Sequence, residues 1–119
     1  MLVDEFLKKT DSELYALLGS SLLGETIGAA PSDPDRPRRF GREWFNGQLG
    51  ALRTRICGHE RLKGVAGTSV SDRAIDAHLL FEILGDFGGN PANTALIAVL
   101  AARIGVGTLC SGYTSQHDG

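Results

Sequence analysis

Apolar residues recur along most of this chain at intervals of three and four residues, which is the period of an amphipathic helix. The pattern is plainest at Leu14, Leu17, Leu18 and Leu22. Alternation of apolar and polar residues over the length of a strand is absent, and β-branched residues do not cluster. The sequence therefore predicts an all-α fold.

Helix boundaries are marked most clearly near the two ends of the chain. Thr10-Asp11-Ser12-Glu13 has the form of a capping box, which predicts a helix over 11–23 that ends at Gly24. Asn90 followed by Pro91 marks the start of a helix over 91–104. We also expect a short helix before residue 10 and a longer one over about 71–87.

The middle of the chain is less regular. Pro31, Pro34 and Pro37 predict a loop over 24–38. Their spacing of three fits polyproline II geometry, and an ordinary surface loop is the alternative.

A helix over about 38–57 follows this loop. Its interior holds Gly41, Gly47 and Gly50, and each glycine costs roughly 1 kcal/mol relative to alanine. We expect either that another backbone packs closely there or that the helix breaks near Asn46-Gly47.

At 119 residues the chain is long enough for one domain with one modest core. We expect a compact antiparallel bundle of about four to six helices over 1–110, followed by a flexible polar tail over 111–119. The helices over 71–87 and 91–104 are the most apolar, so they are expected at the centre of the bundle.

Charge is unevenly distributed, although the formal net charge is only −2. The segment 33–63 has eight basic and four acidic residues, whereas 1–32 and 64–119 each have two basic and five acidic residues. The basic segment can serve an outside partner, or it can satisfy the acidic helices of the same protein. Its candidate interaction residues are Arg38, Arg39, Arg42, Trp44, Arg53 and Arg55.

Arginine beside tryptophan also suits phosphates and stacked bases. A nucleic-acid-binding regulator that uses residues 36–63 is therefore the alternative function. Trp44 and Phe45 are adjacent, however, and cannot both point the same way from a helix. We expect at least one of them to fill the core.

The residue sets that would indicate an enzyme or a metal site are incomplete. Cys57, His59 and Cys110 supply only one close pair, whereas structural zinc sites usually use two. Glu82 and Asp86 share a helix face, but the Glu-x-x-His motif of di-iron bundles is missing. We therefore expect no catalytic residues, no bound metal and no cofactor.

Two cysteines in a chain of this length do not make a disulfide scaffold. Met1-Leu2-Val3 is followed at once by Asp4 and Glu5, without the basic and apolar regions of a signal peptide. We therefore expect free thiols and a cytoplasmic location. No apolar stretch approaches the roughly 20 residues that cross a bilayer, so no membrane partner is expected.

The predicted helices and the residues at their ends follow a particular order over residues 40–110. Trp44-Phe45 and Ile56-Cys57 precede an apolar helix that ends at Gly88-Gly89, and an alanine- and leucine-rich helix then runs to Arg103-Ile104-Gly105. In this order the chain resembles small all-helical proteins encoded beside effector genes in bacterial conflict and defence systems. The resemblance covers most of residues 40–110, rests on packing residues, and implies an adaptor or regulatory role through protein contacts.

The sequence thus favours a non-enzymatic protein–protein interaction module, bacterial and cytoplasmic. Its partner is expected to be another protein or a second copy of the chain. The apolar helix surface over 71–104 exceeds what so small a protein readily buries alone, which makes a homo-oligomer an expectation as well.

Overall fold

A computed structural model describes residues 2–24, 35–57 and 70–110, without the side chains of 70–75 and 107. Within these residues the chain forms helices and turns and no strand. The helices are α1 (Leu2–Leu7), α2 (Asp11–Leu23), α3 (Arg36–Gly47), α4 (Leu49–Ile56), α5 (Val70–Leu84), α6 (Pro91–Ile104) and α7 (Val106–Leu109). The predicted all-α bundle is confirmed, with six helices of six residues or more and the single turn of α7.

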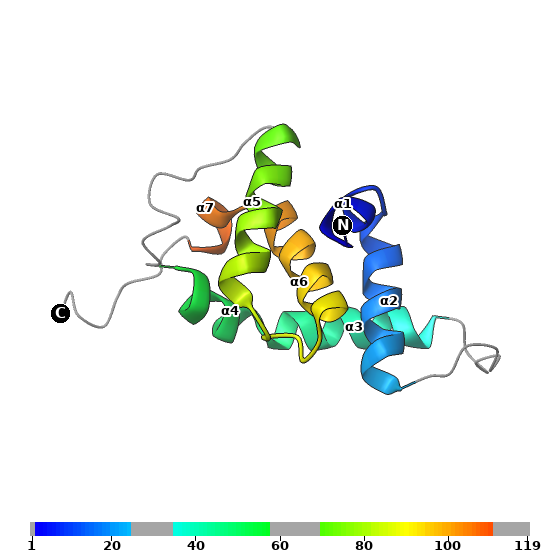
Figure 1. The fold of residues 1–119 in the computed structure, drawn as a ribbon. Helices are drawn as coiled ribbons and strands as arrows, with labels where there is room; N and C mark the ends of the chain where they lie inside the picture. The colour runs from blue at the N-terminus through cyan, green and yellow to red at the C-terminus, as the bar shows by residue number, and fades with distance from the viewer. Residues whose placement is uncertain (1, 25–34, 58–69, 111–119) are drawn as a thin grey trace.

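α6 lies at the centre of the bundle, and every residue from Asn93 to Ala102 is buried (Figure 1). α1, α2, α5 and α7 all pack against it. The helix can be buried on all sides because no charged residue occurs between Pro91 and Ala102. α6 therefore occupies the central position that its apolar composition predicts, and α5 packs against it.

The predicted helix starts are confirmed in detail. The hydroxyl of Thr10 accepts from the amide of Glu13 at 3.2 Å, and the Glu13 carboxylate accepts from the amide of Thr10 at 3.0 Å. Gly24, in the left-handed conformation with φ 68°, ends α2. At the start of α6 the side chain of Asn90 accepts from the amide of Asn93 at 2.8 Å.

α2 and α3 approach so closely that two glycines are required at their contact. A Cβ atom on Gly41 would lie 2.0 Å from the carbonyl oxygen of Tyr15, and one on Gly19 would lie 1.7 Å from that of Pro37. Neither distance accommodates a methyl group, so only glycine allows this approach. Close packing of another backbone, one of the two alternatives for the glycine-rich helix, holds at Gly41.

The other alternative, a break, holds a few residues later. α3 ends at Gly47 and α4 begins at Leu49, so the single helix predicted over 38–57 is two helices separated by Gln48. A Cβ atom on Gly47 or Gly50 would meet nothing within 4 Å. These two glycines therefore accompany the break without any close contact.

Two predicted boundaries are wrong by a few residues. α3 begins at Arg36, because Pro37 lies in its first turn, where no amide donor is needed. α5 ends at Leu84 instead of residue 87, because Gly85 adopts a left-handed conformation with φ 58°. The prolines at 31 and 34 and the expected tail over 111–119 lie outside the described residues.

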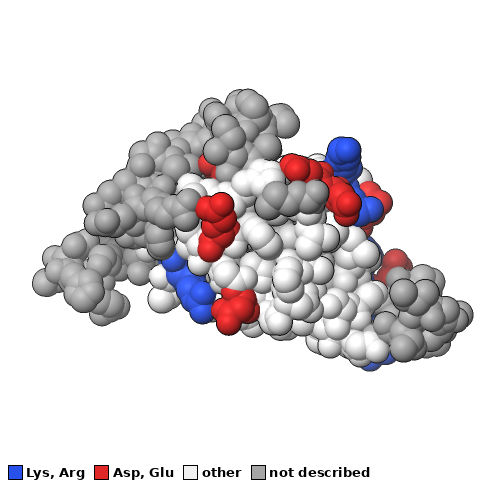
Figure 2. Space-filling model, viewed as in Figure 1, with Lys and Arg blue, Asp and Glu red and all other residues white. Residues whose placement is uncertain are grey.

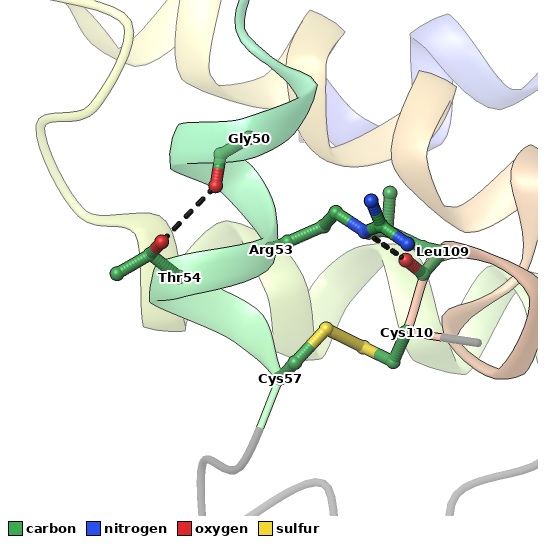
Figure 3. The surroundings of a disulfide bond; sticks show 6 residues. All are labelled: Gly50, Arg53, Thr54, Cys57, Leu109 and Cys110. Carbon is green, nitrogen blue, oxygen red and sulfur yellow. Dashed lines mark hydrogen bonds between the residues drawn. A yellow bond between two sulfur atoms is a disulfide. The ribbon is translucent and has the colours of Figure 1, made fainter. Parts of the chain in front are cut away.

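The expectation of two free thiols is wrong. Cys57, at the end of α4, is bonded to Cys110, at the end of α7 (Figure 3). The two Cα atoms are 5.6 Å apart, although 53 positions separate the residues in sequence. The expectation treated the cysteines as separate buried residues, whereas the bundle brings the two helix ends together.

Candidate functional site

The predicted interaction residues divide between two helices with different surroundings. Those on α3 are Arg38, Arg39, Arg42 and Trp44, and those on α4 are Arg53 and Arg55. Because the chain breaks at Gln48, the two helices do not present one continuous face.

The inner side of α3 is held against α2. Pro37, Gly41 and Phe45 follow one another at intervals of four and are all buried. The rings of Phe45 and Tyr15 pack with centroids 6.0 Å apart. Backbone contact at Gly41 adds to this packing. The contact with α2 therefore fixes the orientation of α3, including the side that faces away from α2.

The outer side of α3 carries cations and one aromatic ring. Arg36, Arg39 and Arg42 are spaced by three and are exposed, and the neighbouring Phe40 is 37% exposed. We call these four residues the α3 face. Glu43 is the one acidic residue of this helix, so the net charge of the α3 face and its surroundings on α3 is positive.

The α3 face contrasts with a neighbouring surface that has almost no charge. The side of the molecule turned to the viewer in Figure 2 is largely uncharged over α2 and α6. The sequence agrees, because the segments 14–23 and 91–102 hold no charged residue. The arginines of α3 are therefore a local concentration of charge.

Arg38 and Trp44 contribute less to this surface than the sequence predicted. Arg38 forms an ion pair with Asp35 at 3.7 Å, at the start of the same helix. Trp44 is half-buried against the core, and Phe45 is 1% exposed. The prediction that at least one of the two aromatic residues fills the core is confirmed.

Arg53 and Arg55 bind the protein's own helix ends. Nε of Arg53 donates to the carbonyl of Leu109 at 2.8 Å, and Nη1 of Arg55 donates to the carbonyl of Leu84 at 3.3 Å. These carbonyls end α7 and α5, where no amide of the same helix is available and the helix dipole is negative. The guanidinium of Arg55 also lies 5.6 Å from the ring centroid of Phe87.

Arg103, which is not among the predicted interaction residues, has the same role. It donates to the carbonyl of Leu7 at 3.1 Å, to that of Lys9, and to the Asp11 carboxylate at 2.7 Å. Its position in the last turn of α6 was visible, but its partners lie 92 or more positions away. Arg53, Arg55 and Arg103 thus bind groups of the protein itself, mainly carbonyls at helix ends.

The charge of Arg42 also reaches α2. Burial raises the pKa of Tyr15 above its ordinary value of 10.0, and the nearby Asp11 carboxylate raises it further. Arg42 lowers the pKa of the same phenol. Arg42 therefore lies close enough to α2 for its charge to act on the Tyr15 phenol.

The other candidate groups do not assemble into a site among the described residues. Cys57 and Cys110 are bonded to each other, and no three His, Cys, Asp or Glu side chains in 2–24, 35–57 and 70–110 are placed to hold a metal ion. His59 lies outside these ranges. Glu82 and Asp86 are both exposed at the end of α5 and in the turn after it.

Comparison with protein families, curated proteins and solved structures gives no match to this chain. None of the helices in the described part of the chain is long and apolar enough to cross a membrane. The function is therefore inferred from the geometry of the chain itself.

Proposed function

We propose that this protein is a non-enzymatic protein–protein interaction module that docks on an acidic segment of a partner through the α3 face. One observation carries the proposal: Arg36, Arg39 and Arg42 are exposed together on a helix whose other side is held by backbone contact with α2. Guanidinium groups bind carboxylates through paired hydrogen bonds. A helix that is already fixed loses little freedom on binding.

Phe40 adds an apolar anchor to this face. Aromatic residues and arginine are enriched among the residues that dominate binding energy at protein interfaces. The ring of Phe40 is 37% exposed, beside Arg36 and Arg39 along the helix. The face thus combines the two residue types that such interfaces use most.

The alternative, a nucleic-acid-binding regulator, is less well supported by the same arrangement. Arg53 and Arg55 donate to helix-end carbonyls, so the cations on α3 are the main ones that the described part of 36–63 offers outward. Three phosphate contacts would give a slope of only about −3 in a plot of log affinity against log salt. A short acidic protein segment fits so small a cationic face better.

Crosslinking tests this proposal directly. A photoreactive amino acid at position 40 is expected to form a discrete adduct with one partner in the native cells. Ser12, exposed in the first turn of α2, is the matched control position and is expected to give no such adduct. The variant R36E/R39E/R42E should lose the adduct.

The nature of the adduct decides between the alternatives. An adduct that is removed by protease and resists nuclease supports a protein partner, and one of twice the chain's mass identifies a second copy of the chain. An adduct removed by nuclease, or equal adducts at positions 40 and 12, would refute docking of a protein on the α3 face.

The biological setting is a further part of the proposal. A role beside an effector in a bacterial conflict system is tested by the genes that flank this one. The expectation of a cytoplasmic location rested partly on free thiols, and disulfides are rare in reducing compartments. Alkylation of intact cells before lysis is therefore the test: unmodified, paired Cys57 and Cys110 would place the protein in an oxidising compartment, and alkylated thiols in the cytoplasm.

A further inference from the structure

α7 is the shortest helix in the described part of the chain. It consists of Val106–Leu109, and no side chain caps its first turn. A single turn is not stable by itself in water, because it has too few internal hydrogen bonds to offset the loss of chain freedom. The position of α7 therefore depends on its links to the neighbouring helices.

The link between α7 and α6 is a single glycine. Gly105 lies between the last residue of α6 and the first residue of α7, and its φ of 94° is one that other residues rarely adopt. A Cβ atom at this position would have only the hydroxyl oxygen of Thr108 within 4 Å, at 3.9 Å. Side chains therefore pack loosely around this junction, which suits a hinge.

At its other end α7 is linked to α4. Cys110 is bonded to Cys57, and the carbonyl of Leu109 accepts from Nε of Arg53 at 2.8 Å (Figure 3). The remaining contact is incomplete, because a surface depression open to solvent separates the two helices on one side; its lining residues are Leu49, Arg53, Ile104, Thr108 and Leu109. The disulfide is therefore the strongest link between α7 and α4.

α4 has anchors that do not involve α7. Arg55 donates to the carbonyl of Leu84 at 3.3 Å, and its guanidinium lies 5.6 Å from the ring centroid of Phe87. Leu52 and Ile56 are fully buried in the core. α6 likewise packs against α1, α2 and α5. Opening of the disulfide is therefore expected to free α7 while α4 and α6 stay in place.

We propose that the Cys57–Cys110 bond is a reversible switch, which docks α7 on α4 when it is oxidised and releases α7 when a dithiol reduces it. Release would bring apolar surface into contact with solvent, because Val106 and Leu109 are only 6% and 5% exposed while α7 is docked. The chain has no other cysteine, so reoxidation within one molecule can re-form only this bond. The switch is independent of the α3 face.

The reduction proceeds by thiol–disulfide exchange. A thiolate of the dithiol attacks Sγ of Cys110, which is half-buried, whereas Cys57 is 8% exposed. The sulfur of Cys57 leaves as a thiolate and takes up a proton. The second thiol of the reductant then attacks the mixed disulfide, and Cys110 leaves in the same way. The protein gains two electrons and two protons, and the dithiol becomes a disulfide.

The test is ¹⁵N relaxation of the full-length protein in buffers of reduced and oxidised dithiothreitol. On reduction, the order parameters of the Leu109 and Cys110 amides should fall from about 0.85 to below about 0.6, and those of Leu52 in α4 and Ala98 in α6 should stay near about 0.85. Reoxidation should restore the first two. The bond should be reduced at the poise that glutathione maintains in the cytosol and oxidised at that of the secretory pathway.

Two variants separate the disulfide from the other link. C57S/C110S should have a mobile α7 in both buffers. R53M loses the hydrogen bond to Leu109 but keeps the disulfide, so its α7 should stay ordered when oxidised.

Four results would overturn the proposal. They are unchanged order parameters in α7 of the reduced wild type, loss of order in α4 and α6 together with α7, a bond that stays oxidised at the cytosolic poise, and a mobile α7 in oxidised R53M.

Discussion

Replacement of Gly41 by alanine tests the contact that fixes α3. The added methyl group would lie 2.0 Å from the carbonyl oxygen of Tyr15 and 2.9 Å from the amide nitrogen of Gly19. Carbon and oxygen atoms in ordinary contact lie about 3.5 Å apart, so α2 and α3 would have to separate by more than about 1 Å. The side chain of Phe45, 1% exposed at this contact, would lose packing as they separate.

The separation of the two helices should lower the free energy of unfolding by about 3 kcal/mol, the upper end of the range found for overpacked cores. This loss is expected to exceed the roughly 1 kcal/mol that alanine contributes through its higher helix propensity. For a domain of this size the midpoint of thermal unfolding should fall by about 10 °C, measured by circular dichroism.

Gly50 provides the matched control for Gly41. It lies inside α4, and a Cβ atom there would meet nothing within 4 Å. Gly50→Ala should therefore raise the free energy of unfolding by up to about 1 kcal/mol, because only the helix-propensity term remains. Glycine-to-alanine replacement should thus lower the free energy of unfolding at position 41 and raise it at position 50. A Gly41→Ala protein as stable as the wild type would refute the close contact of α2 and α3.

Three further predictions concern links between distant parts of the chain and one helix cap. Replacement of Cys57 and Cys110 by serine should lower the free energy of unfolding by about 4 kcal/mol, because the bond joins residues 53 positions apart. The unfolding midpoints of the wild type with and without dithiothreitol measure the same effect, and identical midpoints would contradict it. Arg103→Met should cost about 2 kcal/mol and increase hydrogen exchange in α1, since one carbonyl at the end of that helix and one just after it lose their donor; unchanged exchange would count against this role. The folded-state pKa of Glu13 is lowered below 4.5, first by the backbone hydrogen bond from Thr10, so the stabilising effect of its carboxylate is present above pH 4.5 and is lost as the pH falls through the lowered value. NMR titration should show the lowered pKa, and Glu13→Gln should remove this contribution to the loss of stability in acid. A Glu13 pKa at or above 4.5 would contradict the prediction.

Local features of the fold were predictable from the sequence because their causes are local. Thr10 and Glu13 lie within one helical turn, and each can satisfy the other's amide whatever the rest of the chain does. The same holds for the cap at Asn90. The central position of α6 was predictable because the segment from Pro91 to Ala102 has no charged residue on any side of the helix and is therefore expected to be buried.

Features that depend on distant residues were not predictable. Nothing near Cys57 indicates that the end of α7 lies beside it, and the composition of the chain favoured free thiols. The glycine at position 41 indicated close packing, but its partner, Gly19, became apparent only when the two helices were placed together.

The candidate site was predictable only in part, for the same reason. The sequence placed the arginines of 36–63 in one basic segment, but it did not distinguish those on α3 from those on α4. Arg53 and Arg55 donate to carbonyls of the protein itself because the ends of α7 and α5 lie within their reach. Arg39 and Arg42 remain exposed because they lie on the side of α3 that faces away from α2.

Docking through the α3 face is tested most directly by the dissociation constant of the partner captured at position 40. Measurements should compare the wild type, R36E/R39E/R42E and the control Lys8→Glu, which reverses an exposed charge on another part of the chain. We expect the triple variant to bind about a hundredfold more weakly, from roughly 1 kcal/mol for each ion pair lost, and Lys8→Glu to bind as the wild type does. Equal affinity of the triple variant and the wild type would contradict docking through this face.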